Sequence, residues 1–190
     1  MQEEAQALFP ARNALVPLTA LWLLALVGIF ALVGITLRSL CGVIFAAVLL
    51  WLSFLDLRDG MLYDVITLPF GAAGLVLSLM GALTPVGNAL IGGTLCGVLF
   101  YCLYIAARGG LGGGDVKLAA ALGIWLGWEA ALIAVWIAFI LGGIAAILLL
   151  VTGRKKRRDG IPFGPFLAVG GYVAFVAGAQ LWQLYWGIAR

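Results

Sequence analysis

Seven apolar stretches, separated by short segments that carry charge, glycine or proline, constrain what this chain of 190 residues can fold into. A helix needs about 20 apolar residues to cross the hydrocarbon core of a bilayer. The mean hydropathy of +1.18 and the 10% share of charged residues also lie outside the range of soluble domains. The sequence therefore predicts an all-α fold, a polytopic membrane helix bundle that forms a single domain over residues 1–190.

The seven predicted transmembrane helices lie near residues 15–37, 40–55, 62–83, 86–107, 116–128, 130–151 and 163–188. The fifth is short, because at 1.5 Å per residue it covers only about 20 Å of a core about 30 Å thick. Either it begins within the membrane, or neighbouring protein and water reach in to meet it. Pairs of small residues, Gly93/Gly97, Gly123/Gly127 and Ala174/Gly178, predict close packing between helices.

The basic residues predict the orientation of the bundle. With the N-terminus in the cytoplasm, nine of the eleven Lys and Arg residues fall on the cytoplasmic side: Arg12, Arg58, Arg108, Lys117, Arg154, Lys155, Lys156, Arg157 and Arg158. Only Arg38 and Arg190 fall on the other side, a clear positive-inside bias. The N-terminal tail (1–14), a Gly-rich loop (108–115) and a basic loop (152–162) are then cytoplasmic. We interpret the basic loop as an anchor beside acidic membrane lipid, not as a nucleic-acid site.

The sequence has no histidine, which excludes several chemistries. Ser-His-Asp and Cys-His nucleophiles, the zinc-binding His-Glu-x-x-His helix and an imidazole proton shuttle all require it. The three cysteines, Cys41, Cys96 and Cys102, contain no Cys-x-x-Cys pair and are interpreted as small packing residues. No metal or cofactor is predicted. Acid and base work in an enzyme of this composition would rest on carboxylates, lysine, tyrosine or backbone groups.

The strongest irregularity is the run Gly-Gly-Leu-Gly-Gly-Gly-Asp-Val-Lys at residues 109–117. Glycine costs roughly 1 kcal/mol relative to alanine inside a helix, so the run predicts irregular backbone and close approach by another group. Asp115 then lies where this loop meets the start of an apolar helix. Asp56 mirrors it at the end of the apolar run 49–55, two crossings earlier and therefore on the same side of the membrane.

Ionisable residues at a membrane boundary are costly and often functional. Two carboxylates that share a site hold one proton between them near neutral pH, which is the pattern of an aspartic protease. Asp56 and Asp115 are therefore candidates for a catalytic pair. The residues leave three alternatives open: Asp115 acts only as a helix cap, the pair relays ions or protons in a small transporter or channel, or the aspartates merely pack helices in an assembly subunit.

Four blocks resemble the type IV prepilin peptidase family, membrane aspartic proteases of the Gly-x-Gly-Asp kind. The blocks are Phe-Leu-Asp-Leu at 54–57, Asp-Val-Ile-Thr-Leu-Pro at 64–69, Gly-Gly-Gly-Asp-Val-Lys-Leu at 112–118, and Ile-Pro-Phe-Gly-Pro-Phe at 161–166. The resemblance implies a bacterial inner-membrane endopeptidase. Its members remove the leader from type IV pilins, pseudopilins and related secretion or competence proteins on the cytoplasmic side, next to the apolar helix of the substrate.

The resemblance also assigns residues. Asp56 and Asp115 take the positions of the catalytic pair, Gly112 and Gly114 belong to the loop that would let the substrate backbone approach, and Asp64 aligns with a family Asp or Asn. Tyr63 stands where the family usually has proline, and Asp59 is expected to be a solvated loop residue. Lys117 is expected to snorkel to the membrane surface or to contact acidic substrate residues. Pro162, Gly164 and Pro165 are expected to form the turn that starts the last span.

One departure from the family concerns methylation. Many bacterial members carry a cytoplasmic domain with two Cys-x-x-Cys pairs and also methylate the new N-terminus of the pilin. Here residues 38–40 join the first two predicted spans directly, and no such pair occurs. Peptidase activity is therefore predicted, and N-methyltransferase activity is not.

Overall fold

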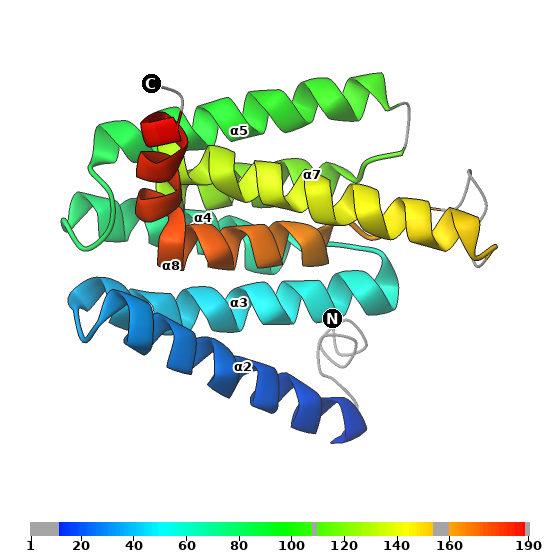
Figure 1. Ribbon diagram of the computed structural model, residues 1–190, viewed down its shortest axis with the longest axis horizontal. Helices are drawn as coiled ribbons and strands as arrows, with labels where there is room; N and C mark the ends of the chain where they lie inside the picture. Colours follow the sequence, from blue (N-terminus) through cyan, green and yellow to red (C-terminus); the bar gives the residue numbers. More distant parts are fainter. Residues whose placement is uncertain (1–11, 108–109, 154–159, 189–190) are drawn as a thin grey trace.

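The computed structural model describes residues 12–107, 110–153 and 160–188, which fold into seven helices joined by short turns (Figure 1). They are α2 (Arg12–Val33), α3 (Leu37–Asp59), α4 (Asp64–Leu79), α5 (Val86–Ala106), α6 (Gly113–Leu126), α7 (Trp128–Val151) and α8 (Gly164–Ile188). These residues contain no strand, so the predicted all-α fold is confirmed. Most of the predicted tail (1–11), Arg108, Gly109, the basic cluster at 154–158 and Arg190 lie outside the described residues.

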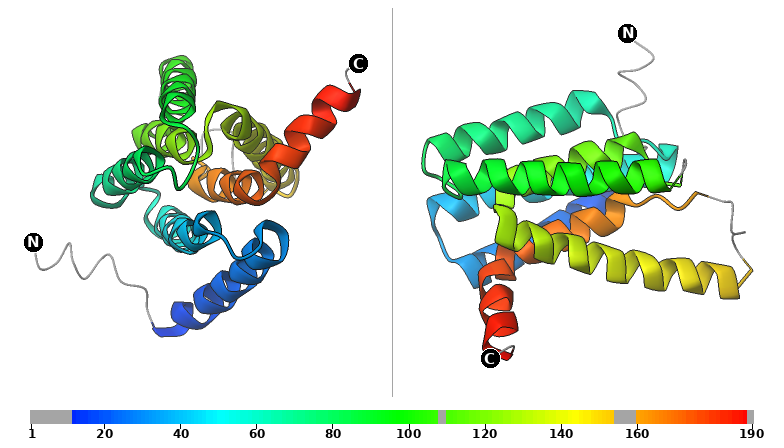
Figure 2. Two further views of the ribbon diagram at one scale, coloured as in Figure 1. Left: turned by 90° about the vertical axis from the view of Figure 1, so that its left-hand side faces the viewer. Right: turned by 90° about the horizontal axis from the view of Figure 1, so that it is seen from above.

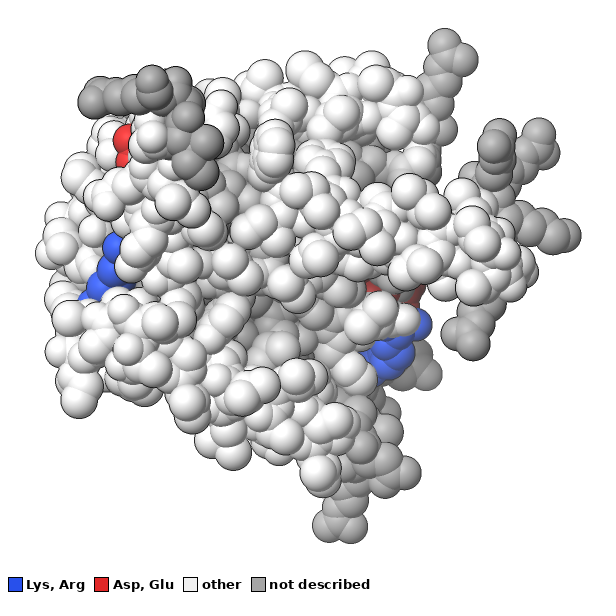
Figure 3. Space-filling model, in the orientation of Figure 1, with Lys and Arg blue, Asp and Glu red and all other residues white. Residues whose placement is uncertain are grey.

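Five helices, α2, α3, α5, α7 and α8, are long and apolar enough to cross a membrane. The helices α4 and α6 are shorter, with 16 and 14 residues. Figure 3 shows charged side chains near two opposite ends of the bundle, with an uncharged surface between them. A wide uncharged band between two charged ends suits a bilayer, and the prediction of a polytopic helical membrane protein is confirmed.

The short helix α6 lies in the middle of the bundle and packs on α4, α5, α7 and α8 (Figure 2). Eight of its residues are buried: Asp115, Leu118, Ala119, Ala121, Leu122, Gly123, Trp125 and Leu126. A helix that other helices surround need not match the thickness of the bilayer, because its sides contact protein and not lipid. The packing of α6 on four neighbouring helices agrees with the explanation in which neighbouring protein reaches the short fifth span.

Glycine allows α5 and α6 to touch backbone to backbone. A methyl group at Gly123 would lie 2.7 Å from the backbone nitrogen of Gly93, and one at Gly92 would lie 2.8 Å from the backbone carbonyl carbon of Gly127, which caps the end of α6. At the crossing of α7 and α8, a methyl group at Gly178 would lie 2.9 Å from the side chain of Ala130. The predicted small-residue packing is confirmed at these crossings.

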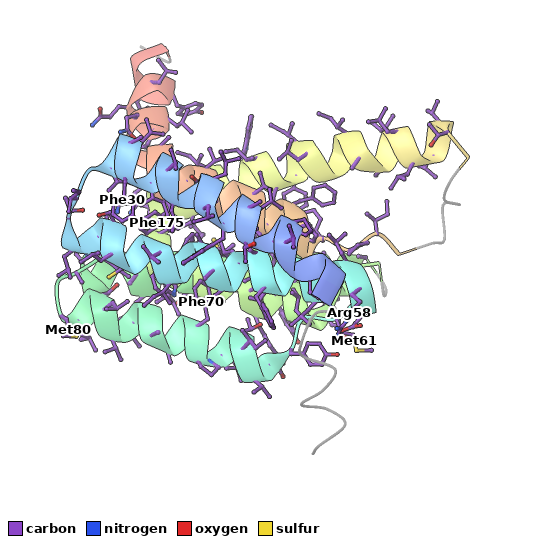
Figure 4. The ribbon with its side chains drawn as sticks, turned by 90° about the horizontal axis from the view of Figure 1, so that it is seen from below. Phe30, Arg58, Met61, Phe70, Met80 and Phe175 are labelled. Atoms are coloured by element: carbon purple, nitrogen blue, oxygen red, sulfur yellow. The ribbon has the colours of Figure 1, made fainter. Side chains whose placement is uncertain are left out.

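An aromatic cluster joins four of the helices. The ring of Phe45 on α3 lies 5.7 Å from Phe70 on α4, 5.2 Å from Trp125 on α6 and 4.9 Å from Phe175 on α8. The indole of Trp125 also donates a hydrogen bond of 2.7 Å to the carbonyl of Phe70. Phe70 and Phe175 lie inside the bundle, away from the end that carries Arg58 and Met61 (Figure 4). This cluster fixes α3, α6 and α8, the three helices that carry the candidate site.

Several helix boundaries differ from the predicted ones by up to about one turn, and two of these differences end at a glycine turn. The helix α3 continues for one turn beyond residue 55, as far as Asp59, and ends at Gly60, whose φ of 67° is left-handed and whose amide donates to the carbonyl of Asp56. The charged residues Asp56, Arg58 and Asp59, which follow the predicted end of this span at residue 55, therefore form the last turn of the helix. The helix α4 stops at Leu79, four residues early, because the chain turns at Gly81 with a φ of 73°.

Candidate active site

Asp56 lies in the last turn of α3 and is almost fully buried, with 5% of its surface exposed. Its oxygen Oδ2 accepts a hydrogen bond of 2.8 Å from the backbone amide of Gly164, the first residue of α8. The amino end of a helix favours negative charge, so the start of α8 stabilises an ionised Asp56. The predicted start of the last helix is confirmed, and its contact with Asp56 is a feature that the sequence did not predict.

Asp115 is the third residue of α6 and has 6% of its surface exposed. Its Oδ2 accepts a hydrogen bond of 3.0 Å from the backbone amide of Gly112, the residue that caps the helix. The alternative that Asp115 caps its helix is therefore correct in part. Its other oxygen, Oδ1, is buried and has no hydrogen-bond partner among the described residues, which is unusual for a buried polar atom. Capping uses one carboxylate oxygen and leaves the second for another role.

The electrostatics of Asp115 link it to Asp56. Asp115 lies in the first turn of α6, outside the five long apolar helices. Its pKa is raised from 3.8 to about 6: burial is the largest cause, the amide of Gly112 opposes it, and the charge of Asp56 adds to it. The two carboxylates therefore belong to one site, at which the end of α3 meets the starts of α6 and α8. Among the described residues, no three Cys, Asp or Glu side chains gather as metal ligands would.

The glycine run is more ordered than the sequence predicted. Gly113 and Gly114 belong to the first turn of α6, so the irregular segment ends before them. A methyl group at Gly114 would lie 2.7 Å from Cβ of Leu62 and 3.2 Å from its carbonyl oxygen, whereas one at Gly113 would meet nothing within 4 Å. The close approach that the run predicted does occur at Gly114, and the approaching group is the chain's own segment between α3 and α4.

Asp64, at the start of α4, and Lys117, in the second turn of α6, form an ion pair. The side chains are about half exposed, 50% for Asp64 and 45% for Lys117. The prediction that Lys117 snorkels or contacts the substrate did not include this partner. Residues two apart on a helix do not share a face, so Lys117 is not expected to contact Asp115, and its ion pair ties α6 to α4 beside the site.

Asp59 is exposed, as predicted, but it belongs to a helix, and Tyr63 lies beside it. Asp59 is the last residue of α3 and not a loop residue, and its carboxylate pairs with Arg58 and accepts a hydrogen bond of 3.2 Å from the hydroxyl of Tyr63. Tyr63 precedes α4 with a φ of −78°, close to the value that proline imposes. Tyrosine therefore keeps the backbone that the family's proline would give at this position.

The sequence matches the type IV leader peptidase family over residues 43–147, more than half of the chain. The chain belongs to this family. Both aspartates of the site, the ion pair of α4 and α6, and the glycine run fall within the matched region. The start of α8, with Gly164, follows it.

Individual proteins similar to this chain carry names from the same family. Proteins named prepilin leader peptidase/N-methyltransferase match with 36% identity over 189 residues in Aeromonas salmonicida, 39% over 166 residues in Burkholderia pseudomallei, and 36% over 153 residues in Neisseria gonorrhoeae. These alignments cover 95%, 84% and 76% of the chain, and 63%, 53% and 51% of the relatives. The chain thus spans between half and two thirds of the length of these curated relatives. No solved structure matches it significantly.

Replacing Gly114 with alanine is expected to lower the stability of this leader peptidase family member by about 1–3 kcal/mol, because the new methyl group overlaps Leu62. Gly113→Ala is the matched control: it lies one residue earlier, its methyl group meets open space, and alanine favours the helix. The measurement is the Tm of the purified proteins in detergent. Equal Tm values for the two variants would show that the contact between Leu62 and Gly114 does not limit the stability of the protein.

Proposed function

We propose that the chain is an aspartic endopeptidase that removes the leader peptide of prepilin-like proteins on the cytoplasmic side of a bacterial inner membrane. The observation that carries the proposal is the pair of buried carboxylates, Asp56 and Asp115, at the junction of α3, α6 and α8, in a chain without histidine. Membership of the leader peptidase family supports the same reaction and the same class of substrate.

Both carboxylates are buried, and the proposed mechanism gives them different protonation states on the basis of their hydrogen bonds. Asp56 accepts the Gly164 amide at the start of α8, which favours its ionised form. Asp115 has a pKa raised to about 6 and an unpartnered buried Oδ1, which favours a proton there. In the proposed mechanism Asp56 takes a proton from water while the water oxygen bonds to the scissile carbonyl carbon, and Asp115 gives its proton to the carbonyl oxygen. The C–N bond then breaks as the leaving nitrogen takes a proton from Asp56, and the product hydroxyl returns one to Asp115.

The sidedness of the proposal rests on charge. Arg58 and Lys117 lie on the helix ends that carry the two aspartates, whereas Arg38 lies in the first turn of α3, at its opposite end. With the basic cluster at 154–158, the positive-inside rule supports a site that faces the cytoplasm. The proposal covers leader cleavage and not N-methylation, because the sequence lacks the Cys-x-x-Cys pairs that the family resemblance links to methylation.

The pH dependence of cleavage tests this division of roles. The kcat/KM for a prepilin-like substrate is expected to fall as pH rises through about 6, because Asp115 loses the proton that it must give to the carbonyl oxygen. It should fall again at acid pH, when Asp56 also becomes protonated. The measurement is kcat/KM of the purified protein in detergent between about pH 4 and 9, a range that extends to both sides of the raised pKa of about 6 of Asp115. A rate that keeps rising above pH 7 would contradict the assignment of the proton to Asp115.

The same preparation separates this proposal from a transporter. Reconstituted into liposomes, the protein is expected to cleave a prepilin-like substrate and to leave an imposed proton gradient unchanged. Proton flux that depends on Asp56 and Asp115, without cleavage, would favour the relay and overturn the peptidase.

A further inference from the structure

An apolar groove lies between α2, α3 and α8. It encloses a cavity of about 330 Å³, and its lining includes Leu21 and Leu24 on α2, Leu49 and Ser53 on α3, and Pro165 and Val169 on α8. Leu24 and Val169 are 69% and 48% exposed, so the groove is open at its side, at the depth of the membrane-crossing helices. A groove of this kind is accessible from lipid.

Two of its walls lead directly to the candidate site. On α3, Ala46, Leu49 and Ser53 line the groove, and Asp56 is next on the same helical face at the spacing of three and four residues. On α8, Tyr172 and Ala168 line it, and Gly164 is next at the spacing of four. The hydrogen bond between Gly164 and Asp56 therefore lies at the end of both stripes, about 4.5 Å along the helix axis from Ser53.

The third wall, α2, leaves the groove open toward this end. The hydroxyl of Tyr172 donates a hydrogen bond of 2.9 Å to the carbonyl of Ala25, which joins α2 to α8 midway along α2. Beyond this contact, α2 diverges from α3 toward the end at which α3 carries Asp56 (Figure 1). The groove is thus closed at its deep end by Tyr172 and widens toward the aspartates.

We infer that this groove receives the apolar membrane helix of the substrate and presents the residues at its cytoplasmic end to Asp56 and Asp115. The inference rests on the proposed peptidase function and specifies how that site receives its substrate. A path lined by apolar residues, open to lipid and continuous with a buried carboxylate suits a segment that is itself in the membrane. A soluble chain would have to bring its polar backbone through it without partners.

The size of the groove defines the contact. Its volume is about twice that of a 150 Å³ cavity that holds one benzene-sized group, so it accepts about two large apolar side chains of a helix lying along its open side. In lipid, helices associate through such close packing and not through the hydrophobic effect. A bulky residue placed on the wall of the groove therefore weakens the contact by holding the two helices apart.

The test compares two substrates and two variants. One substrate is a prepilin-like protein with its apolar helix, and the other is a peptide that covers the leader and the cleavage site but lacks this helix. In Val169→Trp, the ratio of kcat/KM for the long substrate to that for the peptide is expected to fall at least about 10-fold, mainly through KM of the long substrate. Val98→Trp on α5 is the matched control, a valine with 57% exposure outside the groove, and keeps the wild-type ratio.

If Val169→Trp keeps the wild-type ratio, the groove does not receive the substrate helix, and the inference is wrong. If the wild-type protein cuts neither substrate, the proposed peptidase function itself is wrong. A photo-crosslinking residue at Leu24 in an Asp115→Asn background gives a second measurement. It is expected to capture the uncut long substrate, and the same residue at Val98 is not. Capture of a second copy of this chain, or of phospholipid alone, in the presence of substrate would show that another molecule occupies the groove.

Discussion

The Asp115→Asn protein is expected to leave the leader of a prepilin-like substrate uncut, and Asp56→Asn is expected to do the same. Asparagine keeps the size of the side chain but neither takes a proton from water nor holds the proton that the carbonyl oxygen receives. Acid–base catalysis by a positioned side chain contributes about 10²–10⁴ in rate, so each variant should lose at least about 10²-fold in kcat. The measurement is the rate of leader removal by purified protein, with co-expression in cells as a parallel readout.

Asp59→Asn is the matched control for this experiment. Asp59 lies three residues after Asp56 on the same helix end, but its carboxylate binds Arg58 and Tyr63 instead of a glycine amide of the site. This variant should therefore keep nearly wild-type activity. Because Asp56 and Asp115 are proposed to act as a unit, the double variant should be hardly slower than either single one. Cleavage that survived in both single variants would exclude the pair as the catalytic groups.

The fold was largely predictable because lipid imposes a simple rule on the sequence. Seven apolar stretches predicted seven helices, and each described helix overlaps one of them. One error, at the end of α3, occurred where a charge was taken as the end of a helix. The charged residues Asp56 and Asp59 continue α3, because they face protein partners at its end, Gly164 and Arg58, and do not need to leave the helix to be stabilised.

The candidate site was predictable only in part, for a different physical reason. Topology places Asp56 and Asp115 on one side of the membrane, and that much follows from counting crossings. Their hydrogen-bond partners do not follow from local sequence, because the partner of Asp56 lies 108 residues away at Gly164. The glycine between Pro162 and Pro165 was the available signal, since a residue without a side chain at the start of a helix permits close approach by another group.

Gly164→Ala is expected to reduce kcat for leader removal by about 10²-fold while KM changes little. The alanine amide still has its N–H, but the added methyl group would lie 2.8 Å from Oδ2 of Asp56 and 3.2 Å from its Cβ, both closer than ordinary van der Waals contact. Either the carboxylate rotates away or α8 moves outward, and a displacement of about 1 Å at a catalytic group is enough for such a loss. The measurements are kcat and KM together with the Tm of the variant.

Gly143→Ala on α7 is the control, because a methyl group there meets nothing within 4 Å. It should keep wild-type kcat and Tm, which separates the effect of an added methyl group near Asp56 from that of any Gly→Ala change. Combining Gly164→Ala with Asp56→Asn gives the sharper result. If Gly164 acts by positioning the Asp56 carboxylate, the alanine should cost little further activity once that carboxylate is gone. A full additional 10²-fold loss in the double variant would mean that Gly164 serves the reaction by a route other than Asp56.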